Sequence, residues 1–294
     1  MLGHEPEDIS ALFYLNYCKS GGGLLQMRSD RRGGGQHLRM RQGTQYISHC
    51  LAQDLPAGVL HLEATVTAIS RGSRDSMIVR TPGRIFKASK VIVTAPPPVM
   101  KTIAFDPPLP LEKRLLYESY SYGYYQKVMA VFKKPFWIEK GFCGLSQSFI
   151  GPAAVVRDTS VPGDGKWILT CFMAGAPARA WSQLVEAERK RLLLEQLETV
   201  FEEPTARQLL VELVTHEWPR DEFAGQGCPS PALPPGVLDT VGYALRQPCS
   251  GIHFAGTETA EEWKGYMEGA VRSGERAAAE VAELVQPKGT IAKL

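Results

Sequence analysis

The sequence predicts a mixed α/β fold, and three stretches of the chain carry that prediction. Residues 91–95 form an apolar, β-branched run, which is typical of a strand buried in a parallel sheet. Residues 124–132 alternate between the two faces of a strand. A third strand, residues 252–255, stops at Gly256 and is followed by a loop and a helix. Strands therefore alternate with helices along the chain.

Length and composition indicate an ordinary globular protein. At 294 residues the chain can form one large or two small domains, and 44% hydrophobic with 22% charged residues does not fit a disordered chain. A net charge of +2 gives no reason to expect nucleic acid as a partner. The six cysteines are scattered without metal-ligand spacing, which predicts reduced thiols, no structural zinc and no disulfide framework. No apolar run is long enough to span a membrane, so no transmembrane anchor is expected.

In the first third of the chain the patterns predict helices and short strands. Residues 7–17 carry an apolar stripe at helical spacing, and residues 24–28 fit a short strand before a loop. Thr44 suits the N-cap of a helix whose apolar positions run from Ile47 to Leu55. The strand-like runs that follow are 59–62, 66–69 and 76–81.

Beyond the run at 91–95, which three prolines terminate, residues 111–119 are expected to be helical. On the strand at 124–132, Lys127 shares a face with Met129 and Val131 and so can point inward. A lone lysine in a strand more often lies at an edge. The remaining elements are predicted as strands at 166–173 and 208–218 and one amphipathic helix at 178–201.

The turn after residue 255 is the stretch most informative about function. A strand that ends at Gly256 lets the backbone approach a ligand, and a helix that starts near Met267 offers free N–H groups. This arrangement suits a phosphate or another electron-rich edge of a cofactor. The alternative is a strand–helix unit whose small residues serve tight packing, because such turns are common.

The residue types in this stretch favour the cofactor. It reads Phe-Ala-Gly-Thr-Glu-Thr at 254–259, Trp-x-Gly-Tyr-Met-Glu-Gly-Ala at 263–270 and Gly-Glu-Arg-Ala-Ala at 274–278. A second diagnostic stretch runs from Lys127 to a Lys-Pro-Phe-Trp ending. Together they closely resemble the flavin-containing monoamine oxidases, from about residue 5 to about residue 285. The resemblance implies FAD as the cofactor.

It also implies an incomplete two-domain flavin amine oxidase fold, of α/β (α+β) class, in which FAD-binding sheet segments are interleaved with a substrate domain. Residues 1–40 and 116–220 would belong to the substrate domain, 41–115 and 221–285 to the FAD-binding domain, and 286–294 to a flexible tail. The family's N-terminal strand–GxGxxG–helix is not found in this sequence. We therefore expect a chain that covers the C-terminal part of an oxidase and whose parallel sheet has exposed edges.

The resemblance implies which residues contact the flavin. Backbone of the C-terminal segment would hold pyrophosphate and isoalloxazine, a valine backbone would contact the adenine, and a tryptophan would lie beside the flavin. These residues are Gly256, Thr257, Gly265, Met267, Val66 and Trp218.

Cys228 can be aligned with the family in two registers. Counted back from residues 234–236, it falls on the cysteine that carries the covalent flavin link. Counted forward from Trp218, it falls on the first tyrosine of the two-tyrosine amine cage. The downstream anchor is nearer and is preferred, and Pro229 then takes the place of that tyrosine. In either register one of the two tyrosines of the amine cage is missing. The alternative interpretation of Cys228 is an unreactive thiol in a loop.

The implied reaction is oxidation of a primary or secondary amine, with O₂ as the oxidant and H₂O₂ as a product. Tyr266 would orient the amine, Lys127 would hold a water against the flavin and Gln36 would line the amine pocket. Pattern alone predicts a surface loop for Gln36. Polyamine and L-amino-acid oxidases share this architecture and stay open as alternatives. A further alternative is a truncated, catalytically inactive relative that acts as a fold remnant or an interaction partner.

Partners and location follow from the same features. A small-molecule amine and O₂ are expected, with a homodimer as a further expectation and no metal site. The last residues, Ala292-Lys293-Leu294, resemble the peroxisomal address S-K-L. They predict a peroxisomal protein, with the cytoplasm as the alternative.

Overall fold

The chain forms two compact units in the computed structural model, which describes residues 2–73, 76–221, 223–224 and 227–285. The first unit is Met1–Ser10 with Tyr120–Pro234, and the second is Ala11–Ser119 with Pro235–Leu294.

The unit boundaries differ from the predicted domain boundaries. They fall after residues 10, 119 and 234, whereas the sequence predicted changes after residues 40, 115 and 220. Assignment of these parts to FAD and to substrate stays a prediction. The predicted tail, with Ala292-Lys293-Leu294, lies outside the described residues.

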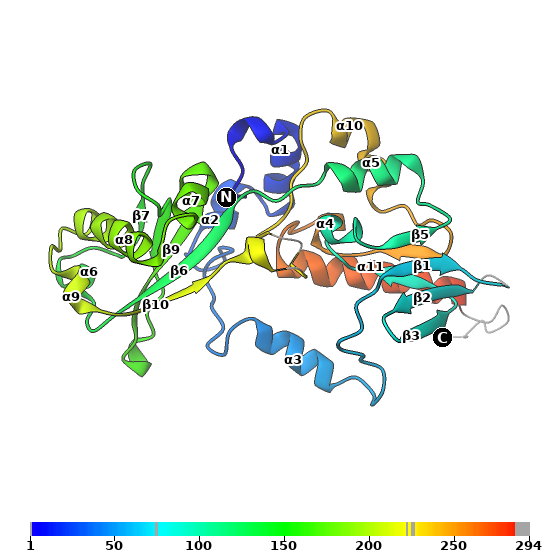
Figure 1. Ribbon diagram of the computed structural model, residues 1–294, viewed down its shortest axis with the longest axis horizontal. Helices are drawn as coiled ribbons and strands as arrows, with labels where there is room; N and C mark the ends of the chain where they lie inside the picture. The colour runs from blue at the N-terminus through cyan, green and yellow to red at the C-terminus, as the bar shows by residue number, and fades with distance from the viewer. Residues whose placement is uncertain (1, 74–75, 222, 225–226, 286–294) are drawn as a thin grey trace. The chain divides into compact units, whose positions relative to one another are not determined.

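The first unit is built on a five-stranded antiparallel sheet in the order β10-β6-β9-β8-β7 (Figure 1). Its central pair is β6 (Tyr125–Phe132) and β9 (Trp167–Ala174), paired without a break. The predicted alternation of β6 is confirmed, with Val128 and Phe132 buried and Lys127 on the open face. The other strands are β7 (Ser146–Gln147), β8 (Val155–Asp158) and β10 (Leu210–His216).

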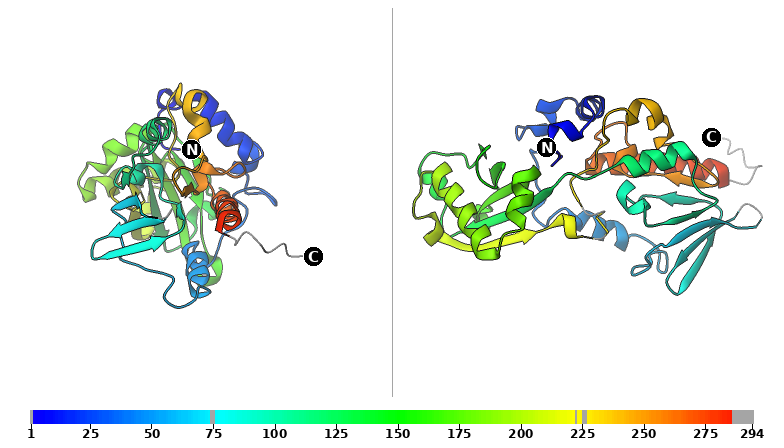
Figure 2. Two further views of the ribbon diagram at one scale, coloured as in Figure 1. Left: turned by 90° about the vertical axis from the view of Figure 1, so that its right-hand side faces the viewer. Right: turned by 45° about the horizontal axis from the view of Figure 1, so that its top comes forward.

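Two helices, α7 (Gly175–Ser182) and α8 (Glu186–Val200), pack on one face of this sheet (Figures 1 and 2). The prediction of one helix over 178–201 was wrong, because the chain is extended at Val185. Glu186 and Glu188 favour a new N-terminus there through the helix dipole. The shorter elements of this unit are α6 (Phe136–Glu139), α9 (Ala206–Leu209), η1 (Pro6–Asp8), η2 (Pro162–Asp164) and η3 (Trp218–Arg220).

The second unit holds two sheets. A four-stranded sheet has the order β3-β2-β1-β5, with β1 and β5 parallel and the other pairs antiparallel. Its strands are β1 (Ala68–Arg71), β2 (Met77–Thr81), β3 (Arg84–Ala88) and β5 (Ala104–Asp106).

The second sheet pairs β4 (Val91–Val93) with β11 (Ile252–Phe254) in parallel. Among the described residues no third strand pairs with either of them, although Ile252 of β11 forms an isolated bridge with Cys249. The prediction that 91–95 is fully buried was wrong, since Ile92 is 37% exposed. A strand with one partner and one uncovered face cannot bury every side chain.

Helices of the second unit agree with the sequence in part. The predicted helix at 111–119 is confirmed as α5 (Leu111–Ser119), and the predicted start near Met267 as α11 (Met267–Val285), which contacts β11 (Figure 1). Residues 24–28 form helix α2 (Leu24–Arg28), not the predicted strand. The other helices are α1 (Ala11–Ser20), α3 (Gln45–Gln53), α4 (Pro97–Met100), α10 (Val237–Val241), η4 (Gly242–Leu245) and η5 (Thr257–Thr259).

Three smaller predictions for the second unit also changed. The helix predicted at 7–17 starts only at Ala11, and residues 59–62 are not a strand. Thr44 does stand at the N-cap of α3, but its side chain makes no capping hydrogen bond. Within the described ranges, no helix is long and apolar enough to cross a membrane, and no cluster of three or more His, Cys, Asp or Glu side chains could bind a metal ion.

Candidate functional site

The second unit brings Tyr266 and Gln36 together at one backbone carbonyl. Met27, the penultimate residue of α2, is completely buried. Its carbonyl oxygen accepts hydrogen bonds from Gln36 Nε2 at 3.2 Å and from the Tyr266 hydroxyl at 3.4 Å. Gly35 allows this approach, because a Cβ there would lie 3.1 Å from the Met27 oxygen. Two residues 230 positions apart in the chain, which the sequence assigned to one pocket, are therefore neighbours.

Tyr17 of α1 completes this cluster. Its ring stacks on that of Tyr266 with centroids 6.4 Å apart, and Trp263 meets Tyr266 edge-on at 5.3 Å. Burial raises the pKa of the Tyr266 phenol, and hydrogen bonds from Tyr17 and Gln36 oppose that rise. Burial also raises the pKa of Tyr17. Both phenols are therefore neutral at ordinary pH.

The strand–turn–helix of the second unit has the geometry that the sequence predicted. Gly256 follows β11 with a φ of 110°, a conformation in which an L side chain would be strained. Its N–H donates to Ser273 Oγ of α11 at 3.0 Å. Thr257 Oγ1 donates to the Tyr266 carbonyl at 2.9 Å, which ties the turn to the tyrosine cluster.

Close packing fixes the start of α11 against this turn. A Cβ at Gly269 would lie 2.4 Å from the Trp263 carbonyl oxygen, so only glycine fits there. Gly265, with a φ of 80°, makes the bend that leads into the helix. Met267 is the first helical residue and is half exposed. Its N–H belongs to the first turn of the helix, which has no acceptor within the helix.

These features fit the flavin that the resemblance implies. A glycine at the strand end, a threonine in the turn and an accessible helix N-terminus are the groups that hold an anionic or electron-rich cofactor edge. Gly256, Thr257, Gly265 and Met267 would supply those contacts through other backbone groups, because the Gly256 N–H and the Thr257 hydroxyl already have partners within the chain. Val66, the predicted adenine neighbour, is half-buried and lies just before β1 in the same unit.

Lys127 and Trp218 lie at the same end of the β6–β10 pair in the first unit. Lys127 is exposed, and its Nζ is 5.5 Å from the centre of the Phe172 ring. His216 is its cross-strand partner on β10. The half-buried Trp218 follows at the start of η3 and meets the His216 ring edge-on at 4.2 Å. The first alternative for Lys127, a side chain pointing inward, is therefore wrong, because alternation along β6 places it on the open face.

Cys228 is half-buried, and its Sγ lies 3.8 Å from the Tyr125 carbonyl oxygen. Burial raises the pKa of the Cys228 thiol to about 12, and the nearby Lys127 ammonium opposes this only in part. A thiol, rather than the nucleophilic thiolate, is therefore present at neutral pH.

Sequence reasoning missed Tyr17 and His216. Tyr17 was assigned to an apolar stripe, but a buried tyrosine hydroxyl normally requires a hydrogen-bond partner, and that requirement was the available signal. For His216 no signal existed, because its place opposite Lys127 depends on the strand register.

Comparisons with known proteins agree with this geometry. Residues 7–282 match the model of the flavin containing amine oxidoreductases, and the chain belongs to that family. It is 39% identical over 283 residues to the Mycobacterium tuberculosis (strain H37Rv) protein AofH, which is named as a flavin-containing monoamine oxidase, and the match covers 96% of this chain and 60% of that protein. It is 33% identical over 280 residues to human amine oxidase [flavin-containing] B, with coverage of 94% and 53%.

Solved structures give the same result for the fold. The chain superimposes on cyclohexylamine oxidase from Brevibacterium oxydans with a TM-score of 0.87 and 29% identity. That match covers 97% of this chain and 62% of the other. The predicted flavin amine oxidase fold is confirmed, and the chain spans between half and two thirds of the length of these relatives.

Proposed function

We propose that this chain provides amine-binding and flavin-binding residues of a flavin-dependent amine oxidase. The observation that carries the proposal is the meeting of Tyr266 and Gln36 at the Met27 carbonyl, with Thr257 tying the family's flavin-binding turn to Tyr266. When bound, FAD supplies the two-electron chemistry by which an amine becomes an imine and O₂ becomes H₂O₂, after which water converts the imine to an aldehyde and ammonia.

Tyr266 would orient the amine. An amine must present its lone pair, and thus be neutral, to be oxidised. A neutral phenol offers an aromatic face, which attracts the protonated amine less strongly than a phenolate or a carboxylate would. The Met27 carbonyl and Tyr17 fix the ring, so the orientation is set before the substrate binds. Gln36, held by the same carbonyl, would line the pocket.

The substrate we favour is a monoamine with an apolar body. Three aromatic rings, those of Tyr17, Trp263 and Tyr266, gather at the site. The groups that shift the pKa of Tyr266 include no carboxylate from the described residues. A second ammonium, as in a polyamine, would require such a carboxylate, and the α-carboxylate of an amino acid would require an arginine. Polyamine and L-amino-acid oxidation are therefore less favoured.

Lys127 would hold a water molecule for proton transfer. Its ammonium has three donors, stands on the open face of a rigid sheet and lies at the same strand end as Trp218. For FAD, Gly256, Thr257, Gly265, Met267, Val66 and Trp218 are the proposed contacts. Attachment through Cys228 would require the thiol to lose its proton, which its raised pKa opposes.

The visible absorption spectrum of the purified chain, before and after acid precipitation, tests the proposal. Flavin absorbance that co-purifies supports the oxidase, and absorbance that stays in the acid pellet adds the covalent link at Cys228. Absorbance released to the supernatant keeps the oxidase and removes that link. A colourless protein that gains no flavin on dialysis against FAD contradicts the proposal.

Two variants test the residues in an active preparation. Tyr266→Phe keeps the ring but loses the hydroxyl, and we expect kcat/KM to fall about tenfold, the value of one hydrogen bond. Tyr46→Phe, an exposed tyrosine on α3, is the control. Lys127→Met should slow amine oxidation or flavin reoxidation about a hundredfold, and Lys133→Met is its control. Unchanged rates would remove the residue from the mechanism.

A second candidate function is an inactive family member that binds a partner. The observation in its favour is the second unit's two-stranded sheet, in which β4 has no second partner strand among the described residues and Ile92 is partly exposed. Such edges accept a further strand. Analytical ultracentrifugation with and without FAD distinguishes the two candidate functions. A colourless chain that self-associates supports the second candidate, and a homodimer that contains flavin supports the first.

A further inference from the structure

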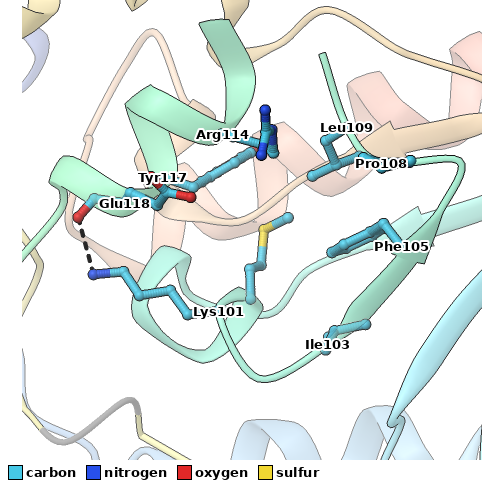
Figure 3. A pocket seen from close by; sticks show the side chains of 9 residues that line it. Lys101, Ile103, Phe105, Pro108, Leu109, Arg114, Tyr117 and Glu118 are labelled. Carbon is cyan, nitrogen blue, oxygen red and sulfur yellow. Dashed lines mark hydrogen bonds between the residues drawn. The ribbon is translucent and has the colours of Figure 1, made fainter. Parts of the chain in front are cut away.

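A cavity of about 200 Å³ lies in the second unit between α4, β5 and α5. Figure 3 shows its lining side chains, all from residues 100–118, so that one short segment of chain forms the whole site. None of these residues belongs to the tyrosine cluster or to the flavin-binding turn.

The floor of this cavity is apolar and well ordered by packing. Met100, Leu109 and Tyr117 are buried, and Phe105 and Ile103 are half-buried along β5 and the turn before it. The Tyr117 hydroxyl donates to the Leu245 carbonyl at 3.5 Å, and its ring meets that of Phe254 at 5.8 Å. The floor therefore offers apolar surface to a small ligand without hydrogen-bonding demands of its own.

The rim of the cavity is positively charged. Lys101 lies along one edge and donates to the Glu118 carbonyl oxygen at 3.0 Å, while Arg114 runs along the opposite edge (Figure 3). Two cations and the single Glu118 carboxylate leave a net charge of +1 at the rim.

Arg114 is the charged side chain of this cavity that is available to bind a ligand. Its guanidinium is exposed and forms no hydrogen bond or ion pair with any residue in the described part of the chain. Elsewhere in the unit, Arg272 and Arg276 are paired with glutamates. An unpaired guanidinium beside an apolar surface can bind a ligand that carries a carboxylate on an apolar group. The guanidinium N–H groups can donate to both carboxylate oxygens at once.

We infer that this cavity binds a small carboxylate with an aromatic or branched apolar body. The apolar body would lie over Met100, Phe105 and Leu109, and the carboxylate would pair with Arg114. A volume of about 200 Å³ limits the ligand to roughly ten non-hydrogen atoms, and we expect dissociation constants of about 0.1 to 1 mM. The inference is independent of flavin binding.

Titration calorimetry of the full chain with phenylacetate tests the inference. Arg114→Gln removes the charge at an exposed position that should not affect folding, and we expect binding to weaken about tenfold or more, the value of a charge-assisted hydrogen bond. Arg39→Gln, which removes an exposed arginine of the same unit, should bind as the parent chain does. Phenylacetamide, which is neutral and has the same shape, should bind at least about tenfold more weakly than phenylacetate.

The location is tested separately with an azido derivative of phenylacetate. Irradiation should label the tryptic peptide 102–113, which carries Ile103, Phe105 and Leu109, and excess phenylacetate should prevent the labelling. Equal binding of phenylacetamide, unchanged binding by Arg114→Gln, the absence of saturable binding or labelling of other peptides would each overturn the inference.

Discussion

The first unit is built around one five-stranded sheet, whereas the second unit is divided between a four-stranded and a two-stranded sheet. In the first, Phe136, Trp137, Leu193 and Leu197 pack into one fully buried cluster under the five-stranded sheet. In the second, the two-stranded sheet has no third strand in the described ranges, and no residue of α3 is buried. Apolar packing therefore holds Trp137 and its neighbours, while hydrogen bonds to a backbone carbonyl hold Tyr266 and Gln36.

The largest expected effect is on the core of the first unit. Trp137 is fully buried, meets Phe132 and Phe136 edge-on, and donates its indole N–H to Asp158 Oδ2 at 2.9 Å. We expect Trp137→Ala to lower the free energy of unfolding by about 3–5 kcal/mol. Hydrogen exchange of β6 and β9 peptides in urea measures this loss. The neighbouring Ile138→Ala, at an exposed position, should cost less than about 0.5 kcal/mol; similar losses for both would break the comparison.

The second effect concerns the hydrogen bond that holds the flavin-binding turn. Ser273→Ala leaves the Gly256 N–H without its acceptor, and we expect a loss of about 1–3 kcal/mol in the second unit. Faster exchange of the Gly256 amide is the measurement. Ser119→Ala, whose hydroxyl bonds only within its own helix, is the control. If the control changes exchange as much as Ser273→Ala does, the turn is not held by this bond.

The third effect is a rise in the stability of the second unit with pH. Lys113 is 1% exposed, with its Nζ 2.6 Å from the Ala244 carbonyl oxygen and 3.7 Å from the centre of the Phe254 ring. Burial lowers the pKa of Lys113 to about 8, with the nearby Arg276 adding to the fall and Cys249 opposing it. Burial likewise lowers the pKa of Lys264 to about 8.

A lysine whose pKa is lower in the folded than in the unfolded state destabilises the fold wherever the lysine is protonated. The free energy of unfolding therefore rises with pH once the pH exceeds the pKa in the folded state. Between about pH 7.5 and 9 we expect each lysine to add about 1 kcal/mol to the stability of the second unit. Above that range the raised pKa values of Cys249 and Tyr117 act in the opposite direction. Lys113→Met should reduce the slope by about half, and the exposed Lys87→Met should leave it unchanged.

The smallest expected effect is on α3. Leu51 is 61% exposed, so Leu51→Gln should change the free energy of unfolding by less than about 0.5 kcal/mol. Urea unfolding measures the change. A loss above about 1 kcal/mol would mean that the apolar stripe of α3 is packed in solution, and the contrast between the units would then be smaller.

The sequence was most informative where a long periodic pattern or a sharp turn signal was present. Leu111–Ser119 and the start of α11 at Met267 were predicted correctly, because helical spacing over two or more turns has no strand equivalent. Residues 24–28 were not, because five residues with three apolar side chains fit a strand and a helix equally well. The break at Val185 was missed because no glycine or proline marks it, and the acidic residues Glu186 and Glu188 are its only signal in the sequence.

The candidate site could be predicted only through the family resemblance. Tyr266 and Gln36 carry no local pattern that links them, since their common acceptor is a backbone carbonyl. The glycine requirement at Gly256 was visible from its place after an apolar strand. The cavity beside Arg114 had no sequence signal, because an unpaired arginine is recognised only when its surroundings are known.

The Met27 carbonyl has a consequence for how this protein can change in evolution. A carbonyl oxygen has two lone pairs, and here one would serve Tyr266 and the other Gln36. A substitution anywhere in α2 that shifts this oxygen would misplace both side chains at once, although it touches neither. Double-mutant cycles should therefore show strong epistasis between α2 and each of the two residues. A single substitution in α2, a helix of five residues, could therefore alter the substrate preference.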